Sequence, residues 1–196
     1  MVQKSQVKTS RYTTKKLFEQ IIMIRPATFQ DIPELERLLD LSVRGLSKEH
    51  YTSRQIDSAL KYIFGIDTQL ISDGTYYVFE TDGIIAGCGG WGMRKTLYGG
   101  DQHKELQDNL LDPITEAARI RAFFVHPDYA RRGIGRQIMD RCEEEAKKHG
   151  FSSLELGATL PGVPLYIAMG FLEIDHIVEP LFDGQKLELV RMQKGI

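Results

Sequence analysis

The spacing of apolar residues changes repeatedly along the chain, and each change predicts a new element of secondary structure. A short apolar run at residues 21–24 predicts a first strand. Asp31 is a good helix N-cap, and the apolar residues after it recur three and four positions apart, which predicts an amphipathic helix. A second helix is expected to begin near Thr52 and to include Ile63.

Two β-rich runs, residues 76–80 and 84–91, flank a Thr-Asp-Gly turn and predict an antiparallel hairpin. Three glycines interrupt the second run and indicate bulges, or the close approach of another chain or a ligand: Gly87, Gly89 and Gly90. Residues 92–115 then show little periodicity and much polarity. A loop of this length inside a compact domain is usually functional or mobile.

The second half of the chain returns to alternating elements. Strands are predicted at residues 119–125, 152–156, 171–178 and 186–192, and helices at residues 133–149 and 162–169. Gly150 suits the C-terminal end of the longer helix. Strands and helices interleaved in this order predict a mixed α/β domain.

The composition fits one globular domain, because 42% of the 196 residues are hydrophobic and can form a full core. The net charge of −2 argues against a broad nucleic-acid surface, and no apolar run is long enough to cross a bilayer. Cys88 and Cys142 have no partners at metal-ligand spacing. We therefore expect two buried thiols, no bound metal and a reducing, cytoplasmic location.

The first twenty residues are rich in Lys, Arg, Ser and Thr and contain a single acidic residue, Glu19. This composition loosely resembles an organellar presequence. A plain extension is an equally simple interpretation, and so is an upstream start codon, because Met23 opens a typical domain. We predict an N-terminal extension at residues 1–22 and one domain at residues 23–196.

Residues 123–136 join a strand, a turn and a helix in the sequence FFVHPDYARRGIGR. Free N–H groups at a helix N-terminus attract an anion, and two glycines let the backbone approach a pyrophosphate closely. Nearby arginines supply positive charge. A P-loop is excluded because no Gly-Lys-Ser/Thr follows, and the turn comes too late for a dinucleotide fingerprint. A plain strand-to-helix turn with solvated arginines is the alternative.

This stretch resembles the acetyl-CoA-binding motif of the GNAT acetyltransferase superfamily. Its members carry Val-x-Pro at the end of the fourth strand, here residues 125–127, and Gln/Arg-x-x-Gly-x-Gly/Ala at the start of the third helix, here residues 130–135. The first position of that turn is Ala130, which departs from the motif, and Arg131 and Arg132 stand beside it. The resemblance implies a single-domain GNAT fold with a mixed, mostly antiparallel central sheet and helices on both faces.

The resemblance also assigns roles to residues. Tyr166, ahead of a Gly-Phe pair, occupies the position of the family's general acid for the departing thiolate; packing of its ring is the alternative. The family's Asn after the fifth strand is missing, and Thr159 stands near that point. The expected contacts of the acetyl-CoA cosubstrate are Phe123, Phe124, Val125, Arg131, Arg132, Gly133, Ile134, Gly135 and Arg136.

By resemblance, the chain is an N-acetyltransferase that moves an acetyl group from acetyl-CoA directly to a primary amine of a small molecule or protein, and a homodimer through C-terminal strands is expected. Backbone N–H groups at a bulge near residues 123–125 would polarise the thioester. Glu116, Glu155 and His126 are candidates for the general base, each with a plain structural alternative. A non-catalytic acyl-CoA-binding regulatory module and another kind of nucleotide-binding domain remain open.

The acceptor is expected to meet the first two helices, the loop at residues 92–115 and the last hairpin. Trp91 and Tyr98 could form one wall of its pocket. Core packing is an equal alternative for Trp91.

Overall fold

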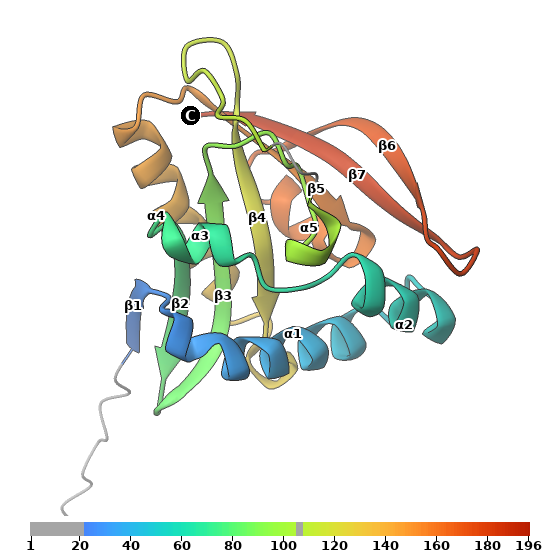
Figure 1. Ribbon diagram of the computed structural model, residues 1–196. Helices are drawn as coiled ribbons and strands as arrows, with labels where there is room; N and C mark the ends of the chain where they lie inside the picture. Colours follow the sequence, from blue (N-terminus) through green and yellow to red (C-terminus); the bar gives the residue numbers. More distant parts are fainter. Residues whose placement is uncertain (1–21, 105–107) are drawn as a thin grey trace, which may run out of the picture.

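The computed structural model describes residues 22–104 and 108–196. Within them, seven strands form one sheet in the order β1-β2-β3-β4-β5-β7-β6 (Figure 1). The pair β4–β5 is parallel and the other neighbours are antiparallel. The predicted mixed, mostly antiparallel sheet is therefore confirmed. The strands are β1 (Ile22–Pro26), β2 (Tyr76–Thr81), β3 (Ile84–Gly92), β4 (Ala118–Val125), β5 (Ser153–Thr159), β6 (Leu172–Pro180) and β7 (Lys186–Gly195).

Helices cover both faces of the sheet (Figure 1). One face carries α1 (Ile32–Leu46), α2 (Ser53–Tyr62) and α3 (Thr68–Ser72), and the other carries α4 (Ile134–Lys148) and α5 (Val163–Ile167). Each face has its own apolar core, so the central strands β2 and β3 are buried on both sides, whereas β6 at the edge is largely exposed. The periodic apolar positions of α1 and α4 are the ones that turn inward, as predicted.

Side-chain hydrogen bonds to the backbone set where α2 and α3 begin. Thr52 caps α2, because its hydroxyl accepts a hydrogen bond from the Gln55 N–H at 3.3 Å while the Gln55 side chain accepts one from the Thr52 N–H at 2.9 Å. The five-residue helix α3 was not predicted, because five residues are too few to show a period. Its cap is the Asp67 carboxylate, which accepts hydrogen bonds from Gln69 and Leu70.

The segment between β3 and β4 is more ordered than its sequence suggests. Its base is a narrow ladder in which Lys95 donates to the Asn109 carbonyl and Leu111 to the Met93 carbonyl. A short 3-10 turn, Asp101–His103, follows farther along. The predicted N-terminal extension lies outside the described residues except for Ile22, which already belongs to β1.

No helix of the described part of the chain is long and apolar enough to cross a membrane. The same residues contain no group of three or more His, Cys, Asp or Glu side chains placed to hold a metal ion.

Candidate active site

The cleft of this fold lies where β4 and β5 separate. The two strands pair at Ala118 with Leu154 and at Arg119 with Glu155, and no register follows these two pairs. Beyond them the parallel strands diverge and leave a cavity between them. Its strand residues are Ile120, Arg121, Ala122, Phe123 and Phe124 from β4 and Leu156, Gly157 and Thr159 from β5.

A β-bulge shapes β4 at the cleft. Cys88 of β3 faces Phe124 and Gly90 faces Arg121, so two β4 residues, Ala122 and Phe123, stand opposite Gly89 alone. Ala122 has a φ of 53°, a left-handed conformation that is costly for a residue with a side chain. A Cβ at Gly89 would lie 2.6 Å from the Phe123 ring. β3 has a bulge of its own against β2, with Ala86 as the extra residue, so the bulge predicted along β3 is confirmed, and the close neighbour of Gly89 is the Phe123 ring of β4.

Backbone donors along β4 are partly engaged already. The Val125 N–H donates to the Ser42 hydroxyl of α1 at 3.1 Å, and the N–H of His126 donates to the Ala86 carbonyl at 2.9 Å. Among the predicted pantetheine contacts, Val125 thus has a protein partner that an incoming cosubstrate would have to displace.

The turn after β4 presents an open helix N-terminus. Gly133, the N-cap of α4, has a φ of 81°, and no atom lies within 4 Å of the place where its Cβ would be. No side chain caps α4 at this end. The first intrahelical donor is Gln137, so the N–H groups of the first turn have no acceptor in the helix. This geometry suits an anion such as a phosphate.

The three arginines of the turn are not equivalent. Arg131 is exposed and has a φ of 64°. Arg132 is exposed and stacks over the Tyr129 ring, 4.9 Å from its centroid. Arg136 donates at 3.0 Å to the Ala168 carbonyl at the end of α5. Arg131 and Arg132 are therefore the free charges of the turn, whereas Arg136 also joins α4 to α5.

Gly135 lies one residue into α4 and is buried against α5. A Cβ there would lie 3.1 Å from the Leu165 side chain. Ile134, beside it, is also buried in the core beneath α4. These two residues set the packing of the turn, and their contribution to an anion site is their backbone N–H.

Tyr166 of α5 lines the cleft from the α4 side of the sheet. Its ring lies edge-on to Phe123, with centroids 6.4 Å apart, and edge-on to Phe171 at 5.7 Å. Burial raises the pKa of the Tyr166 phenol well above its ordinary value, so the group stays protonated at neutral pH. Within the described residues its hydroxyl has no hydrogen-bond partner, so the protein does not engage its proton.

The three candidate bases lie outside the cleft lining. Glu155 is buried at the paired end of β4 and β5, where it contacts the guanidinium groups of Arg119 and Arg191. Glu116 accepts a hydrogen bond from the Asp112 N–H at 2.8 Å within its own turn. His126 accepts one from the Asp128 N–H at 3.2 Å as the cap of a short 3-10 turn. All three side chains thus have structural contacts that account for their positions.

The two aromatic residues proposed for the acceptor wall have different places. Trp91 is fully buried in the core, with its ring beside His149 and Phe151, so its interpretation as a wall residue is wrong. Tyr98 does line the cleft, where it lies against Gly157, and a Cβ at Gly157 would be 2.9 Å from the Tyr98 ring. The missing side chain at position 157 makes the room for that ring.

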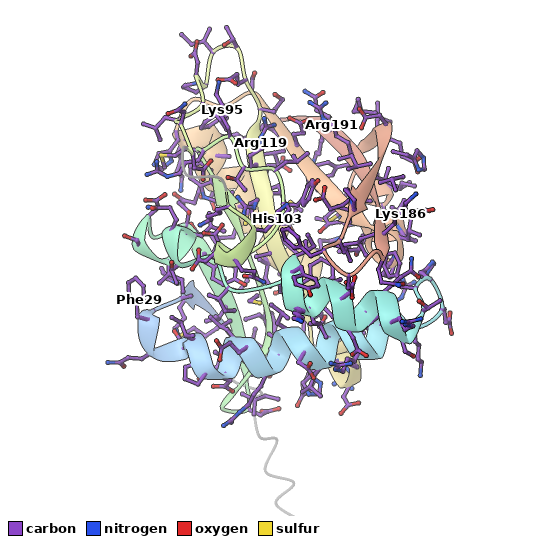
Figure 2. All side chains as sticks on the ribbon, turned by 45° about the vertical axis from the view of Figure 1, so that its right-hand side comes forward. Phe29, Lys95, His103, Arg119, Lys186 and Arg191 are labelled. Carbon is purple, nitrogen blue, oxygen red and sulfur yellow. The ribbon has the colours of Figure 1, made fainter. Side chains whose placement is uncertain are left out.

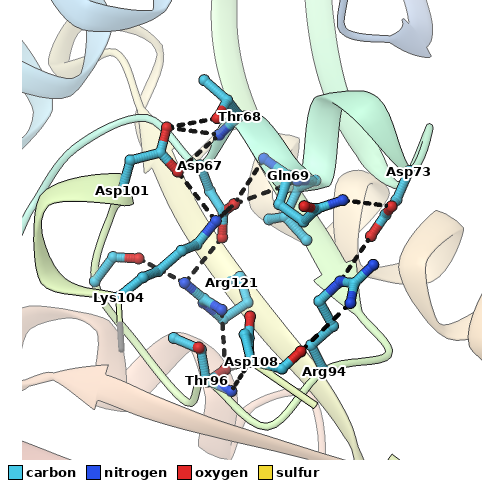
Figure 3. A network of polar contacts seen from close by, with 12 residues as sticks. Asp67, Thr68, Gln69, Asp73, Arg94, Thr96, Asp101, Lys104, Asp108 and Arg121 are labelled. Atoms are coloured by element: carbon cyan, nitrogen blue, oxygen red, sulfur yellow. Dashed lines mark hydrogen bonds and ion pairs between the residues drawn. The ribbon is translucent and has the colours of Figure 1, made fainter. Parts of the chain in front are cut away.

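A polar network around Arg121 and Asp67 anchors the loop on either side of Tyr98, and Figure 3 shows the side chains of this network. Arg121, 4% exposed, donates to the carbonyls of Thr96 and Gly99 at 2.9 and 2.6 Å, on either side of Tyr98. The same guanidinium lies 2.9 Å from the carboxylate of Asp67, which also contacts Lys104. The network joins β4, the N-cap of α3 and the loop over the cleft, and no local sequence pattern predicts it.

Both cysteines are free and buried, as predicted. Cys88 lies behind the bulge, and its burial raises the pKa of the thiol to about 12. A thiol that stays protonated is a poor nucleophile, so an acyl-enzyme on Cys88 is not supported.

The sequence of residues 35–171 matches the model of the acetyltransferase (GNAT) family. The chain belongs to this family. GNAT membership makes it an enzyme of the acyl-CoA-dependent N-acyltransferase class and confirms the resemblance found in its turn and element order. Among curated proteins, none matches the sequence significantly.

Solved structures of GNAT proteins share this fold at low identity. A GCN5-related N-acetyltransferase from Rhodopseudomonas palustris gives a TM-score of 0.66 at 18% identity, over 89% of this chain and 95% of that one. The PaiA N-acetyltransferase from Thermoplasma acidophilum, solved with coenzyme A, gives 0.58 at 14% identity, over 90% and 99%. YncA from Salmonella typhimurium, solved with its cofactor acetyl-CoA, gives 0.58 at 17% identity, over 89% and 94%.

Proposed function

We propose that this protein transfers an acetyl group from acetyl-CoA directly to a primary amine. The observation that carries the proposal is the combination of an open N-terminus at α4 with Tyr166 in the cleft. The uncapped first turn of α4 lies eight residues after β4, the strand that borders the cleft, and Tyr166 lines the same cleft with a hydroxyl that has no hydrogen-bond partner within the described residues. A cosubstrate with phosphates at Gly133 would thus reach Tyr166 with its thioester.

In this proposal, the N–H groups of the α4 first turn and the side chains of Arg131 and Arg132 bind the pyrophosphate. Backbone N–H groups at the bulge of β4 polarise the thioester carbonyl as negative charge develops on its oxygen. The neutral amine nitrogen forms a bond to the carbonyl carbon, the C–S bond then breaks, and the proton that the nitrogen loses as the amide forms restores the Tyr166 phenol. Tyr166 donates its proton to the leaving thiolate, so coenzyme A departs as a neutral thiol.

Two further expectations concern the cellular compartment and the oligomeric state. The buried free thiols support a reducing compartment, and we propose the cytoplasm. A homodimer through the C-terminal strands stays a prediction; β6 stands at the sheet edge and exposes Leu172, Ile174 and Val178, which are apolar side chains that a second chain could cover.

The first test is calorimetric titration of the full chain with acetyl-CoA, with ATP and NAD as controls, followed by thiol-release assays over a panel of primary amines. We expect saturable binding of acetyl-CoA alone and turnover with at least one amine. Tight binding with no turnover on any amine would favour the non-catalytic acyl-CoA-binding module. Absence of binding to a folded sample would overturn the phosphate site itself.

A further inference from the structure

Side chains from both faces of the sheet line the cleft. Tyr166 and Phe123 belong to the apolar core beneath α4 and α5. Phe64, Tyr98 and Phe124 belong to the core on the opposite face, beneath α1, α2 and α3. All five line the same cavity. Since the proposed cosubstrate site lies on the α4 side, the acceptor amine has the opposite side as its entrance, and the inference below rests on the proposed function.

The acceptor entrance is aromatic and offers no free charge on its lining. Phe64 and Phe124 meet edge to face with centroids 6.4 Å apart, and Tyr98 lies flat along Gly157. Arg121 also lines the cavity, but Asp67 and two backbone carbonyls already satisfy its guanidinium. An aliphatic amine arrives at neutral pH as an ammonium ion, and it must lose a proton before its nitrogen can attack.

One carboxylate, that of Glu179, is linked to this entrance by a hydrogen bond from the Tyr98 phenol. The Tyr98 hydroxyl donates a hydrogen bond of 2.7 Å to Oε2 of Glu179, which lies half-buried on β6. Within the described residues the other carboxylate oxygen of Glu179 has no partner. Burial, and then the hydrogen bond to Glu179, raise the pKa of Tyr98 well above its ordinary value. The phenol is therefore neutral and can pass a proton on without itself becoming charged.

We propose that Tyr98 and Glu179 form the proton relay for the acceptor, a primary ammonium carried on an apolar or aromatic stem. The ammonium N–H proton moves to Oη of Tyr98 while the phenolic proton of Tyr98 moves to Oε2 of Glu179. The amine is left neutral with its lone pair free, Tyr98 is again a phenol, and Glu179 is a carboxylic acid. Solvent removes that last proton through the exposed edge of β6.

The experiment must distinguish the effect of the relay from the effects of other titratable groups near it. The His103 ring stacks on Tyr98 from the loop, with centroids 5.4 Å apart and planes at 20°. Figure 2 shows His103 on the face of the sheet that carries α2. Arg191 and Lys186, which belong to β7, are labelled to one side of it. Arg191 is engaged by Glu155 and Asp175. His103→Asn therefore belongs in the experiment as the variant that removes the imidazole ring stacked on Tyr98.

The experiment measures thiol release from acetyl-CoA with phenethylamine, from acidic to alkaline pH, for wild type, Tyr98→Phe and Glu179→Gln. Glutamine can still accept the Tyr98 hydrogen bond but takes no proton. We expect kcat/KM to fall about 100-fold near neutral pH in both variants, with the loss shrinking at alkaline pH as more amine arrives neutral. Acetyl-CoA binding and thermal unfolding should not change. His103→Asn should keep the wild-type pH profile.

Glu173→Gln is the matched control, because Glu173 is an exposed carboxylate at the other end of β6. Wild-type rates for Glu179→Gln at every pH would overturn the relay and leave the proposed function intact. A rise in KM that is independent of pH, with unchanged kcat, would also overturn it and make the pair a structural tether of the loop. Acetyl-CoA binding without transfer to any amine of the panel would instead overturn the acetyltransfer proposal, and the relay with it.

Discussion

The hydroxyl of Tyr76 donates a 3.1 Å hydrogen bond to the carbonyl oxygen of Ala122, the residue of β4 that adopts the left-handed conformation. Tyr76 is fully buried, and its ring reaches beneath β3 to the bulge. The bond satisfies a carbonyl that the bulge removes from the regular ladder. Tyr76 is thus one of the groups that compensate the strain at the cleft.

Tyr76→Phe should therefore lower the free energy of unfolding by about 1–3 kcal/mol, because the Ala122 carbonyl loses a buried partner. Urea denaturation measures this change. Tyr62→Phe, a half-buried tyrosine on α2, is the matched control and should change stability by less than about 0.5 kcal/mol. Equal effects of the two substitutions would show that the bulge does not depend on this bond.

Tyr166→Phe tests the general acid. The substitution keeps the ring between Phe123 and Phe171 and removes the proton that the leaving thiolate needs. We expect kcat to fall at least 100-fold while the Kd for acetyl-CoA, from calorimetry, stays near the wild-type value. If turnover persists at the wild-type rate, the ring has a packing role and the thiolate is protonated by another group or by water.

Gly133→Glu tests the phosphate site. Gly133 and Gly74 share a positive φ, 81° and 71°, and no atom lies within 4 Å of either missing Cβ. Both Glu substitutions should cost a similar strain of about 1–2 kcal/mol. The one at Gly133 also places a carboxylate over the open turn and should abolish acetyl-CoA binding. Gly74→Glu should leave binding unchanged, and a loss of binding in both would indicate a general folding defect.

Asp31 should contribute to acid stability. Bidentate hydrogen bonds from Arg25, both 2.8 Å, lower the pKa of the Asp31 carboxyl well below its ordinary value. A depressed pKa gives stability that is present above the unfolded-state pKa of about 3.9 and is lost as the pH falls toward the folded value. Allowing for solvent screening, Asp31→Asn should cost about 1 kcal/mol at neutral pH. In urea titrations the difference from wild type should vanish in strong acid.

A control for that titration is Asp40→Asn, since Asp40 pairs with Arg44 on the exposed surface of α1. It should leave the unfolding free energy nearly unchanged at every pH. A constant difference between wild type and Asp31→Asn, even in strong acid, would mean that Asp31 acts through packing and not through its charge.

The buried pair of Arg121 and Asp67 should be strongly coupled. Arg121→Met removes the cation and leaves the Asp67 carboxylate without its main buried partner, which should cost about 3–5 kcal/mol. Asp67→Asn keeps an oxygen for the α3 cap and removes the charge. In a double-mutant cycle by urea denaturation, the double variant should be clearly more stable than the sum of the single losses implies. Additive losses would show that the two side chains act independently.

Local sequence patterns are sufficient to predict the elements whose signals lie within a few residues. The helical spacing after Asp31, the glycines along β3 and the Gly-x-Gly turn at residues 133–135 each act within a few residues. Such signals fix backbone conformation and exposure before any long-range contact forms. They were enough to predict a mixed α/β domain, a bulge and the glycine turn that resembles the family motif, and the resemblance then implied the mixed sheet.

Contacts between distant side chains depend on the assembled fold. Tyr98 and Glu179 are 81 residues apart, and their contact depends on how the loop lies over β5 and on the register of β6 with β7. The same holds for Glu155, whose two arginine partners come from different strands, and for Trp91, whose burial depends on where α4 ends. A shift of one residue in strand register turns a side chain to the other face, so contacts of this kind follow from the assembled sheet and not from the local sequence.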